Sequence, residues 1–458
     1  MSRTKKVDAT QGALVPLIIS FVIPLILMTL IQKLFNAVDI AVLGNMADTT
    51  AVAAVGATGT IISLIVDSFF GISTGAKIVF SRAVGKNDPD ELQKTLDSSI
   101  VIASILGIAI AISGLILAPT LLRLVDCPTE CFEGAVLYTR IYLLASPINL
   151  IYNFGAAILT SWGDTRRPLY FAIVAGLANV VLNVILCLIL PQKVMAVAIA
   201  TAASQLICAI LVIHRLCRME GEVKLKLHAI RPHASTTKRI FYLGIPVMLV
   251  NLIYPLANLQ IASAINSYGV AAVAGNSASG TVEQMLGACR VSFGSASATF
   301  IGQNIGAQNP DRVRDSFLNI LWIGVSLTLI CGTLLRLTAP MWLKLFLDDP
   351  VAIEYALMRT RIMLQFQFIS TAVSVFTQAV QAFGYPIFGT LNSIVWILGF
   401  RTFWMNVIYP RVMTYPNLIA CFVVAWCCTL VCYILILGVL YRRYRRSHLV
   451  NLSLLHNA

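Results

Sequence analysis

The chain has 458 residues, of which 58% are hydrophobic and only 12% are charged. Soluble domains are about 45–50% apolar and about 25% charged, so this composition excludes a soluble globular protein and indicates that lipid is the main solvent. The net charge of +13 falls in short loops between apolar blocks, which indicates orientation in a membrane rather than binding to nucleic acid.

Twelve apolar blocks follow one another along the chain, and many reach the ~20 residues that cross a hydrocarbon core about 30 Å thick. Only Pro191, Gln192 and Lys193 separate the fifth block from the sixth, which predicts a tight helical hairpin. The fold class is therefore an all-α polytopic membrane protein with 12 transmembrane helices. The predicted spans are residues 14–36, 52–77, 97–118, 136–159, 169–190, 195–216, 241–265, 272–300, 316–337, 356–381, 386–409 and 417–441.

Lysine and arginine are distributed unevenly between the two sets of loops. The loops on the side of the N-terminus hold 21 of them, whereas the opposite loops hold six, namely Arg123, Lys193, Lys344, Arg359, Arg361 and Arg411. Because basic loops remain on the cytoplasmic side, both termini are predicted to lie in the cytoplasm, with the protein spanning the cell (inner) membrane several times.

The second half of the chain repeats the first. Gly85 and Pro89 after the second span correspond to Gly306 and Pro310 after the eighth, and Gly163 after the fourth corresponds to Gly384 after the tenth, always 221 residues later. Six spans is an even number, so the two halves enter the membrane in the same direction and form pseudo-symmetric lobes around a central cleft, suited to alternating access. The predicted organisation is an N-terminal six-helix lobe (1–214), a basic cytoplasmic linker with an interfacial helix (215–239), a C-terminal six-helix lobe (240–441) and a cytoplasmic tail (442–458).

Several polar residues fall inside the apolar blocks, where a charge costs roughly 2.5–3.5 kcal/mol on insertion scales and so suggests function. Asp39 at the end of the first span could bind and release a proton if buried, or could simply cap a loop. Asn179, Asn183 and Thr201 could converge on it if the first, fifth and sixth spans pack together, although such groups also hold helices together.

Other intramembrane charges allow a structural explanation as well. Glu283 and Arg290 lie on one face of the eighth span, where they could line the cleft or pair with each other or with neighbours. Asp67 and Lys33 could form an ion pair, and Arg401 has no obvious partner in its own helix.

No motif for enzyme chemistry emerges from the sequence. Cys127 and Cys131 form a single C-x3-C pair without further ligands, so no metal site is predicted. We also find no acid–base pair or nucleotide-binding loop, and the chain is not expected to be an enzyme or to carry a cofactor.

The chain resembles the multidrug and toxic compound extrusion (MATE) family, and its branch of DNA-damage-inducible bacterial proteins most of all. The stretches that carry the resemblance are Phe35-Asn36-Ala-Val-Asp39, Gly71-Ile-Ser-Thr-Gly75, Gly244-Ile-Pro246 and Gly302-Gln-Asn-Ile-Gly306-Ala307. The family's fold is two six-helix bundles arranged as a V. The resemblance implies a cation site in the first lobe, with Asp39 as its acid, Asn179 as its amide and Thr201 as its hydroxyl.

Two positions depart from the family's pattern. Many relatives have a second carboxylate where this chain has Asn183, and another branch has a Glu where this chain has Tyr254. The cation-coupling set is therefore expected to be Asp39, Asn179, Asn183 and Thr201, with either H+ or Na+ as the coupling ion.

These observations together predict a cation-coupled antiporter that exports amphipathic organic cations and drugs. The alternative is a flippase for lipids or lipid-linked oligosaccharides with a related two-lobe architecture. The expected partners are small amphipathic substrates and membrane lipids, with no nucleic acid, and the protein is expected to be a monomer. The residues predicted to line the substrate cleft are Met28, Gln32, Asn36, Asn153, Tyr254, Asn258, Gln260, Glu283 and Arg290.

Overall fold

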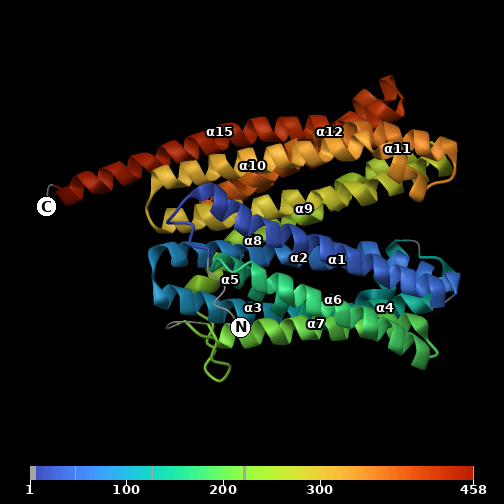
Figure 1. Cartoon of the computed structure of the whole chain (residues 1–458), viewed down its shortest axis with the longest axis horizontal. Coiled ribbons are helices and arrows are strands. Elements are labelled where there is room, and N and C mark those ends of the chain that lie inside the picture. Colours follow the sequence, from blue (N-terminus) through green and yellow to red (C-terminus); the bar gives the residue numbers. More distant parts are fainter. Residues whose placement is uncertain (1–6, 47, 126, 220–222, 457–458) are drawn as a thin grey trace. The chain divides into compact units, whose positions relative to one another are not determined.

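The computed structural model of the chain describes residues 7–46, 48–125, 127–219 and 223–456 (Figure 1). The regular structure of these residues is entirely helical. The longer helices are α1 (Leu14–Met46), α2 (Thr49–Lys86), α3 (Pro89–Leu124), α4 (Phe132–Leu144), α5 (Ser146–Ser161), α6 (Arg166–Ile189), α7 (Lys193–Cys217), α8 (Ala234–Asn266), α9 (Val270–Gly306), α10 (Pro310–Leu337), α12 (Pro350–Ala382), α13 (Pro386–Ser393) and α15 (Tyr415–His456). The short elements are α11 (Ala339–Trp342), α14 (Phe400–Phe403), π-helical turns at Ile394–Gly399 and Trp404–Ile408, and 3-10 turns at Thr129–Cys131, Leu343–Leu345 and Tyr409–Arg411.

The twelve predicted spans all correspond to helical segments in the described part of the chain. Ten helices are long and apolar enough to cross a membrane, and the bent pair of α4 and α5 makes an eleventh. The one predicted span that remains is the eighth, α9. It is long enough to cross a membrane, but glycine, serine and charged residues make it less apolar than the others. The prediction of an all-α membrane protein is thus confirmed.

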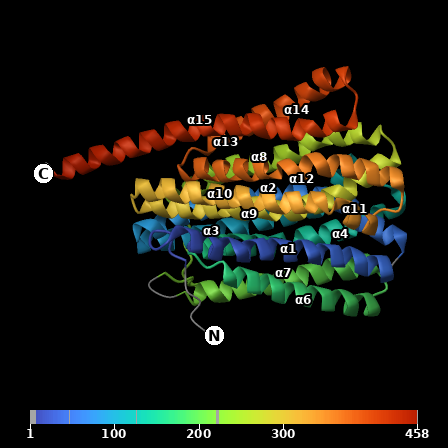
Figure 2. The same ribbon diagram turned by 45° about the horizontal axis from the view of Figure 1, so that its top comes forward.

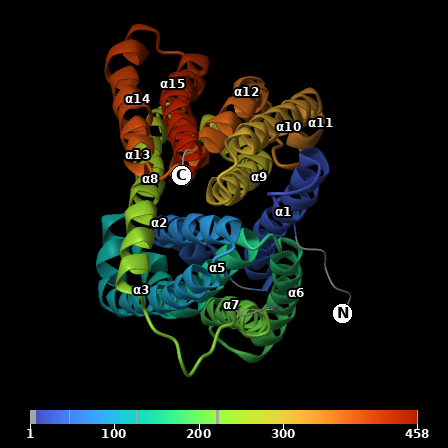
Figure 3. The same cartoon turned by 90° about the vertical axis from the view of Figure 1, so that its left-hand side faces the viewer.

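The chain forms two compact units. Unit 1 comprises the residues up to Asp8 together with Ile23–Met248. Seen along the helices, α5 lies among α2, α3, α6 and α7 (Figure 3). In the same unit α6 lies beside α7, as the tight hairpin at Pro191 predicts (Figure 2).

Unit 2 comprises Ala9–Val22 and Leu249–Ala458. Helix α12 is its centre, because α9, α10 and α15 all pack against it. The last turns of α15 run beyond the other helices of this unit (Figure 1), so the predicted tail continues the helix as far as His456.

Two helices divide their length between the units. Helix α1 passes from unit 2 to unit 1 at Ile23, directly before Pro24. Its beginning is held in unit 2 by Arg312, whose Nε and Nη2 donate to the carbonyl oxygens of Ala9 (2.7 Å) and Gly12 (2.9 Å). Helix α8 passes from unit 1 to unit 2 after Met248.

The beginning of α8 packs on α2 in unit 1 through glycines. A Cβ on Gly71 would lie 2.4 Å from the Met248 nitrogen, and one on Gly75 would lie 2.4 Å from the Ile240 oxygen. On α8, a Cβ on Gly244 would lie 2.7 Å from the Ile72 Cα. The Gly71-x3-Gly75 pair therefore allows close helix packing, as the sequence suggested.

The backbone repeats the 221-residue period of the sequence. Asn87 ends α2 with φ 53°, and Gln308, 221 positions later, follows α9 with φ 54°. Gly163 and Gly384 have φ 90° and 86°. The side chains of Asp88 and Asn309 cap α3 and α10 in the same way, each accepting a hydrogen bond from the backbone nitrogen three residues on. Equivalent turns thus occur at equivalent places in the two halves.

Two predicted spans are less regular than expected. The fourth bends by 47° between α4 and α5, where Pro147 lacks an N–H donor and disfavours helical geometry at the residue before it. The eleventh contains two π-helical turns around α14.

The linker differs from its prediction as well. The expected interfacial helix is absent from residues 223–233, which form turns and irregular chain between α7 and α8. Their backbone is bound to α3 instead, because the Lys224 nitrogen donates to Gln93 (3.0 Å) and the His233 nitrogen donates to Ser98 (3.1 Å).

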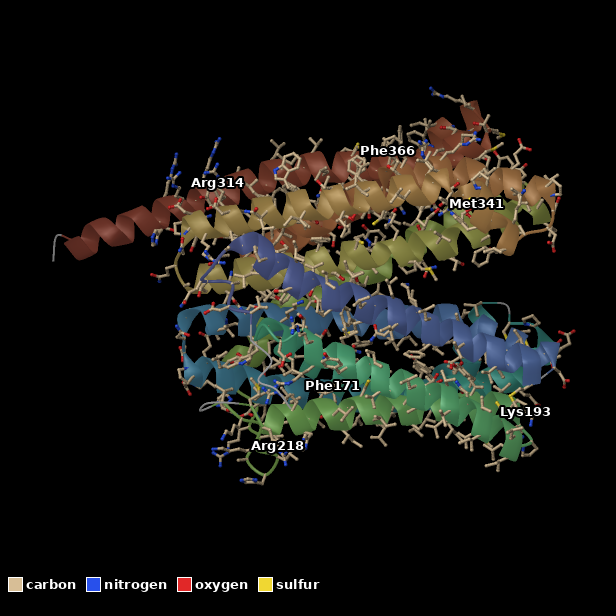
Figure 4. All side chains as sticks on the ribbon, in the orientation of Figure 1. Phe171, Lys193, Arg218, Arg314, Met341 and Phe366 are labelled. Carbon is tan, nitrogen blue, oxygen red and sulfur yellow. The ribbon has the colours of Figure 1, made fainter. Side chains whose placement is uncertain are left out.

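Loops of each unit lie at its two ends, as Figure 4 marks. In unit 1, Arg218 and Lys193 lie at opposite ends of α7. In unit 2, Arg314 and Met341 lie at opposite ends of α10 and its continuation into α11. The polar side chains described next belong to the helices between these ends.

Candidate ion-coupling site

Four predicted residues from three helices meet inside unit 1. Asp39 on α1 is only 7% exposed, and Asn179 and Asn183 on α6 are buried one helical turn apart. The Asn183 amide nitrogen donates to Asp39 Oδ1 (2.5 Å) and to Asn179 Oδ1 (3.2 Å). Thr201 on α7 donates to the other Asp39 oxygen at 3.4 Å and to the Val197 carbonyl at 2.9 Å. From the sequence these residues could converge if the first, fifth and sixth spans packed together, and the structure brings them into contact.

Close packing between α1 and α6 sets the register of this cluster. The Phe35 ring lies against Gly176, where any Cβ would overlap it. Phe35 is one turn before Asp39, and Gly176 is one turn before Asn179. The missing side chain of Gly176 thus lets α1 approach α6 just where the carboxylate must reach the amides.

The site's chemistry is that of a carboxylate held by neutral groups. Among the described residues no lysine or arginine forms an ion pair with Asp39. Asn183 Oδ1 is buried and accepts no hydrogen bond from any residue that the structure describes. Such a carboxylate can be neutralised by a proton or by a small cation that prefers oxygen ligands.

Tyr138, which was not predicted from the sequence, lies near this cluster. Tyr138 on α4 is buried, within electrostatic range of Asp39 and Thr201. Its ring stacks with that of Tyr142 at 6.2 Å between centroids. A tyrosine in an apolar block resembles an ordinary core residue, so only the fold reveals this position.

Three of the predicted cleft residues of unit 1 are described in detail. The Tyr152 hydroxyl contacts the Met28 sulfur at 3.9 Å and interacts with Gln32. Asn153 donates to Asn149 at 2.6 Å on the same helix. The side chain of Asn36 lies outside the described residues, as does that of Asp67.

In unit 2 Glu283 forms a buried ion pair. Its two oxygens accept from Arg359 Nε (2.7 Å) and Nη2 (2.8 Å), and Arg359 Nη1 donates to Asn276 at 2.8 Å. Arg359 was predicted to be a loop residue, which was wrong, because it lies in α12 and is 8% exposed. Arg290, two turns after Glu283 on α9, is half-buried.

The remaining predicted cleft residues lie on the part of α8 that belongs to unit 2. Asn258 accepts a hydrogen bond from Arg401 Nη1 at 2.9 Å, and Tyr254, one turn earlier, is within electrostatic range of the same guanidinium. Gln260 is exposed on this helix. The structure thus connects two of the predicted cleft residues to the arginine that lacked a partner in the sequence.

An all-helical membrane fold with duplicated halves and a buried carboxylate among amides defines a membrane transporter. The sequence model of the MatE family matches residues 24–185 and 246–403, and the chain belongs to this family of multidrug efflux transporters.

Individual relatives agree with this assignment. A probable multidrug resistance protein of Bacillus subtilis, YoeA, is 24% identical over 387 residues, which cover 83% of each chain. The FAD transporter of Shewanella oneidensis is 25% identical over 312 residues, covering 67% of this chain and 69% of that protein. An outward-facing multidrug resistance MATE transporter has the same fold, with a TM-score of 0.87 over 97% of this chain and 100% of that one, at 20% identity.

Proposed function

We propose that this transporter exports small amphipathic organic cations across the cell membrane in exchange for protons, with Asp39 as the ion-binding group. The observation that carries the proposal is the buried Asp39 carboxylate, which is bound to Asn183 and Thr201 and has no basic side chain paired with it among the described residues. Burial penalises the charge of a carboxylate in such surroundings, so the uptake of a proton, which removes this charge, is favoured.

The amide of Asn183 suits both protonation states of Asp39. When Asp39 is charged, the amide nitrogen donates to it, as described above. When Asp39 is protonated, rotation of the amide would bring its unused Oδ1 to accept the new O–H donor. The cluster can therefore exchange a proton without leaving a buried charge unsatisfied.

Protonation is then coupled to movement of α1. Pro24 frees the carbonyl oxygen four residues earlier and makes the helix easier to bend, and it lies where α1 passes from one unit to the other. Neutral Asp39 would loosen the contact between α1 and α6, so that the first helix repacks and substrate is released outward. We place both termini in the cytoplasm from the basic loops and assign the transport cycle to a monomer.

The names of the relatives support export of small molecules rather than lipid flipping. YoeA is named a probable multidrug resistance protein, and MepA of Staphylococcus aureus, a further relative at 22% identity, is named a multidrug export protein. A lipid-linked oligosaccharide flippase would be expected to carry many unpaired basic groups for a pyrophosphate. Of the two buried arginines among the described residues, Arg359 is neutralised by Glu283, which leaves only Arg401 for such a group.

Efflux from proteoliposomes tests the coupling ion. Purified protein is reconstituted with a fluorescent cationic dye, and a proton gradient and a sodium gradient are imposed separately. We expect the proton gradient alone to drive dye movement. If only the sodium gradient drives dye movement, the protein is still an exporter but its coupling ion is Na+. If neither gradient drives dye movement, the proposal is contradicted.

The substitution Asp39→Asn tests whether Asp39 is the ion-binding group. Asparagine preserves shape and hydrogen bonding but cannot take up a proton, so we expect coupled transport to fall to the rate of protein-free liposomes while the melting temperature stays near that of the wild type. Asp348→Asn, at an exposed loop position, is the matched control and should transport normally. Full activity of Asp39→Asn would remove Asp39 from the mechanism.

A further inference from the structure

The last helix carries an exposed group of arginines directly after its predicted membrane span. The group, called the arginine face below, consists of Arg442, Arg443, Arg445 and Arg446 of α15, all of which are exposed. On a helix with 3.6 residues per turn, the four side chains lie within about 160° of one another. The last turns of α15 run beyond the other helices of unit 2 (Figure 1), so the arginine face is open to its surroundings.

The opposite side of the same turns packs against unit 2. The Tyr441 hydroxyl donates to the Pro310 carbonyl oxygen at 3.3 Å, and the ring of Tyr444 lies 5.7 Å from that of Phe383, measured between centroids. Tyr441 and Tyr444 are three residues apart and therefore lie on one side of the helix. These contacts fix the rotation of α15, so that the arginine face points away from the rest of the unit.

The arginine face has no acidic partner in the part of the chain that the structure describes. Asp311 and Asp315, at the start of α10, are within electrostatic range of Tyr441 on the packed side of the helix, but neither forms an ion pair with the four arginines. Arg312, by contrast, is used inside unit 2, because it donates to two backbone carbonyl oxygens. Like charges one turn apart repel one another, so the arginine face is stabilised by a counter-charge from outside the chain.

The position of the arginine face along α15 matches the headgroup layer of a membrane. The predicted last span ends at residue 441, and the arginines fall within the next five positions, which cover about 7.5 Å at 1.5 Å per residue. The headgroup region on each side of the hydrocarbon core is about 5–8 Å thick. Phospholipid phosphates are therefore expected at the depth of these side chains, which are long enough to reach along the surface toward them.

The residue type also favours phosphate as the ligand. A guanidinium can donate two parallel charge-assisted hydrogen bonds to phosphate oxygens, whereas a lysine acts as a point charge. All four basic residues of the arginine face are arginines, whereas the linker at 223–233 mixes lysine, arginine and histidine. Clusters of four or more basic residues directly on the cytoplasmic side of a membrane helix are typical of sites for anionic lipids.

We propose that the arginine face of α15 binds the phosphate groups of anionic phospholipids in the inner leaflet. The phosphate oxygens accept hydrogen bonds from neighbouring guanidinium groups and offset the repulsion between them. Because α15 packs against α12, the centre of unit 2, the bound lipid holds the cytoplasmic end of this unit at the membrane surface. The inference rests on the proposed function only for the cytoplasmic position of the C-terminus, which selects the leaflet, and is independent of Asp39 and of the coupling ion.

Native mass spectrometry of the purified protein in detergent tests this interaction without any ion gradient. Phosphatidylglycerol and phosphatidylcholine with the same acyl chains are titrated separately, and the affinity of the first bound lipid is measured. We expect phosphatidylglycerol to bind about tenfold more tightly or better, because each arginine near an anionic lipid contributes about fivefold. Equal affinities overturn the proposal. Excess soluble glycerol phosphate should leave the lipid bound, and its displacement would identify a soluble phosphate as the ligand and overturn the assignment to lipid.

A double variant, Arg442→Gln with Arg446→Gln, tests whether the arginine face is responsible. Both side chains are exposed, so the fold should persist while the affinity for phosphatidylglycerol falls on the order of tenfold and that for phosphatidylcholine stays within about twofold. The matched control is Lys344→Gln with Arg411→Gln, which removes two exposed basic groups at the opposite end of unit 2 and should keep the preference. Retention of the preference in the first variant, or its loss in the control, contradicts the proposal.

Discussion

A buried ion pair such as Glu283 with Arg359 strongly constrains the residues that form it. Both side chains are at most 10% exposed, and the two hydrogen bonds between them are 2.7 and 2.8 Å long. Glu283→Gln removes the charge but keeps the shape, which leaves the guanidinium buried without its counter-ion. Breaking a buried pair by removing one partner costs about 3–5 kcal/mol, so we expect a markedly lower melting temperature in detergent.

Glu354→Gln is the matched control for this prediction. Glu354 lies on the same helix as Arg359, α12, but is exposed, and its substitution should change the free energy of unfolding by less than about 0.5 kcal/mol. A melting temperature of Glu283→Gln equal to that of the control would mean that the pair does not stabilise unit 2.

At the residue scale, the sequence predicted contacts that depend on helical spacing. Asn179 and Asn183 are four residues apart, which places them on one face of any helix, and Asp39 and Thr201 join them in the structure. The partner of Glu283 was not predictable in this way. Arg359 lies 76 residues later on another helix, and only the packing of α9 on α12 brings the two together.

At the scale of helices, glycines on α2 allow a direct comparison. Gly71 lies where a Cβ would meet the Met248 backbone nitrogen at 2.4 Å, whereas no atom of the described residues lies within 4 Å of a Cβ at Gly56. Gly71→Ala therefore forces α2 and α8 apart, and we expect it to destabilise the protein by about 1–3 kcal/mol. Gly56→Ala should be neutral or stabilise slightly, because alanine favours a helix by about 1 kcal/mol.

Thermal unfolding of the two variants side by side checks this prediction. The same substitution in the same helix changes helix propensity equally, so any difference between the variants reports the contact with α8. Equal melting temperatures would show that α2 and α8 do not pack closely at Gly71.

The positions of the helices could be predicted from the lengths of the apolar blocks, but the irregularities of the helices could not. Pro147 bends the fourth span, and Gly107 of α3 packs directly against it. The residue 221 positions later is Phe368, in the uninterrupted helix α12. A proline inside an apolar block is compatible with either a bent or a straight helix, and the sequence offered no means to choose. The π-helical turns around Arg401 likewise follow no residue pattern that sequence periodicity could detect.

At the scale of the whole molecule, the duplication explains why so much was predictable. Turns at Asn87 and Gln308, and at Gly163 and Gly384, have matching backbone angles 221 residues apart, so each half supports the interpretation of the other. The halves differ in their buried charges. Among the described residues, unit 1 holds an acid among amides at Asp39, and unit 2 holds an arginine, Arg401, that pairs with no carboxylate.

The energetics of exchange give a final prediction about the intact transporter. If one proton enters for each monovalent cation that leaves, no net charge crosses the membrane, and only the pH gradient drives export, at about 1.4 kcal/mol per pH unit. A divalent cation that leaves for one proton carries one net charge outward against an inside-negative potential, which opposes it by about 2.3 kcal/mol per 100 mV. We therefore expect that collapsing the potential with valinomycin leaves the export of a monovalent dye unchanged and increases that of a divalent dye. Nigericin, which collapses the pH gradient, should stop both. Loss of monovalent transport on collapse of the potential alone would show that more than one proton moves per substrate, and Asp39 could then not be the only group that carries them.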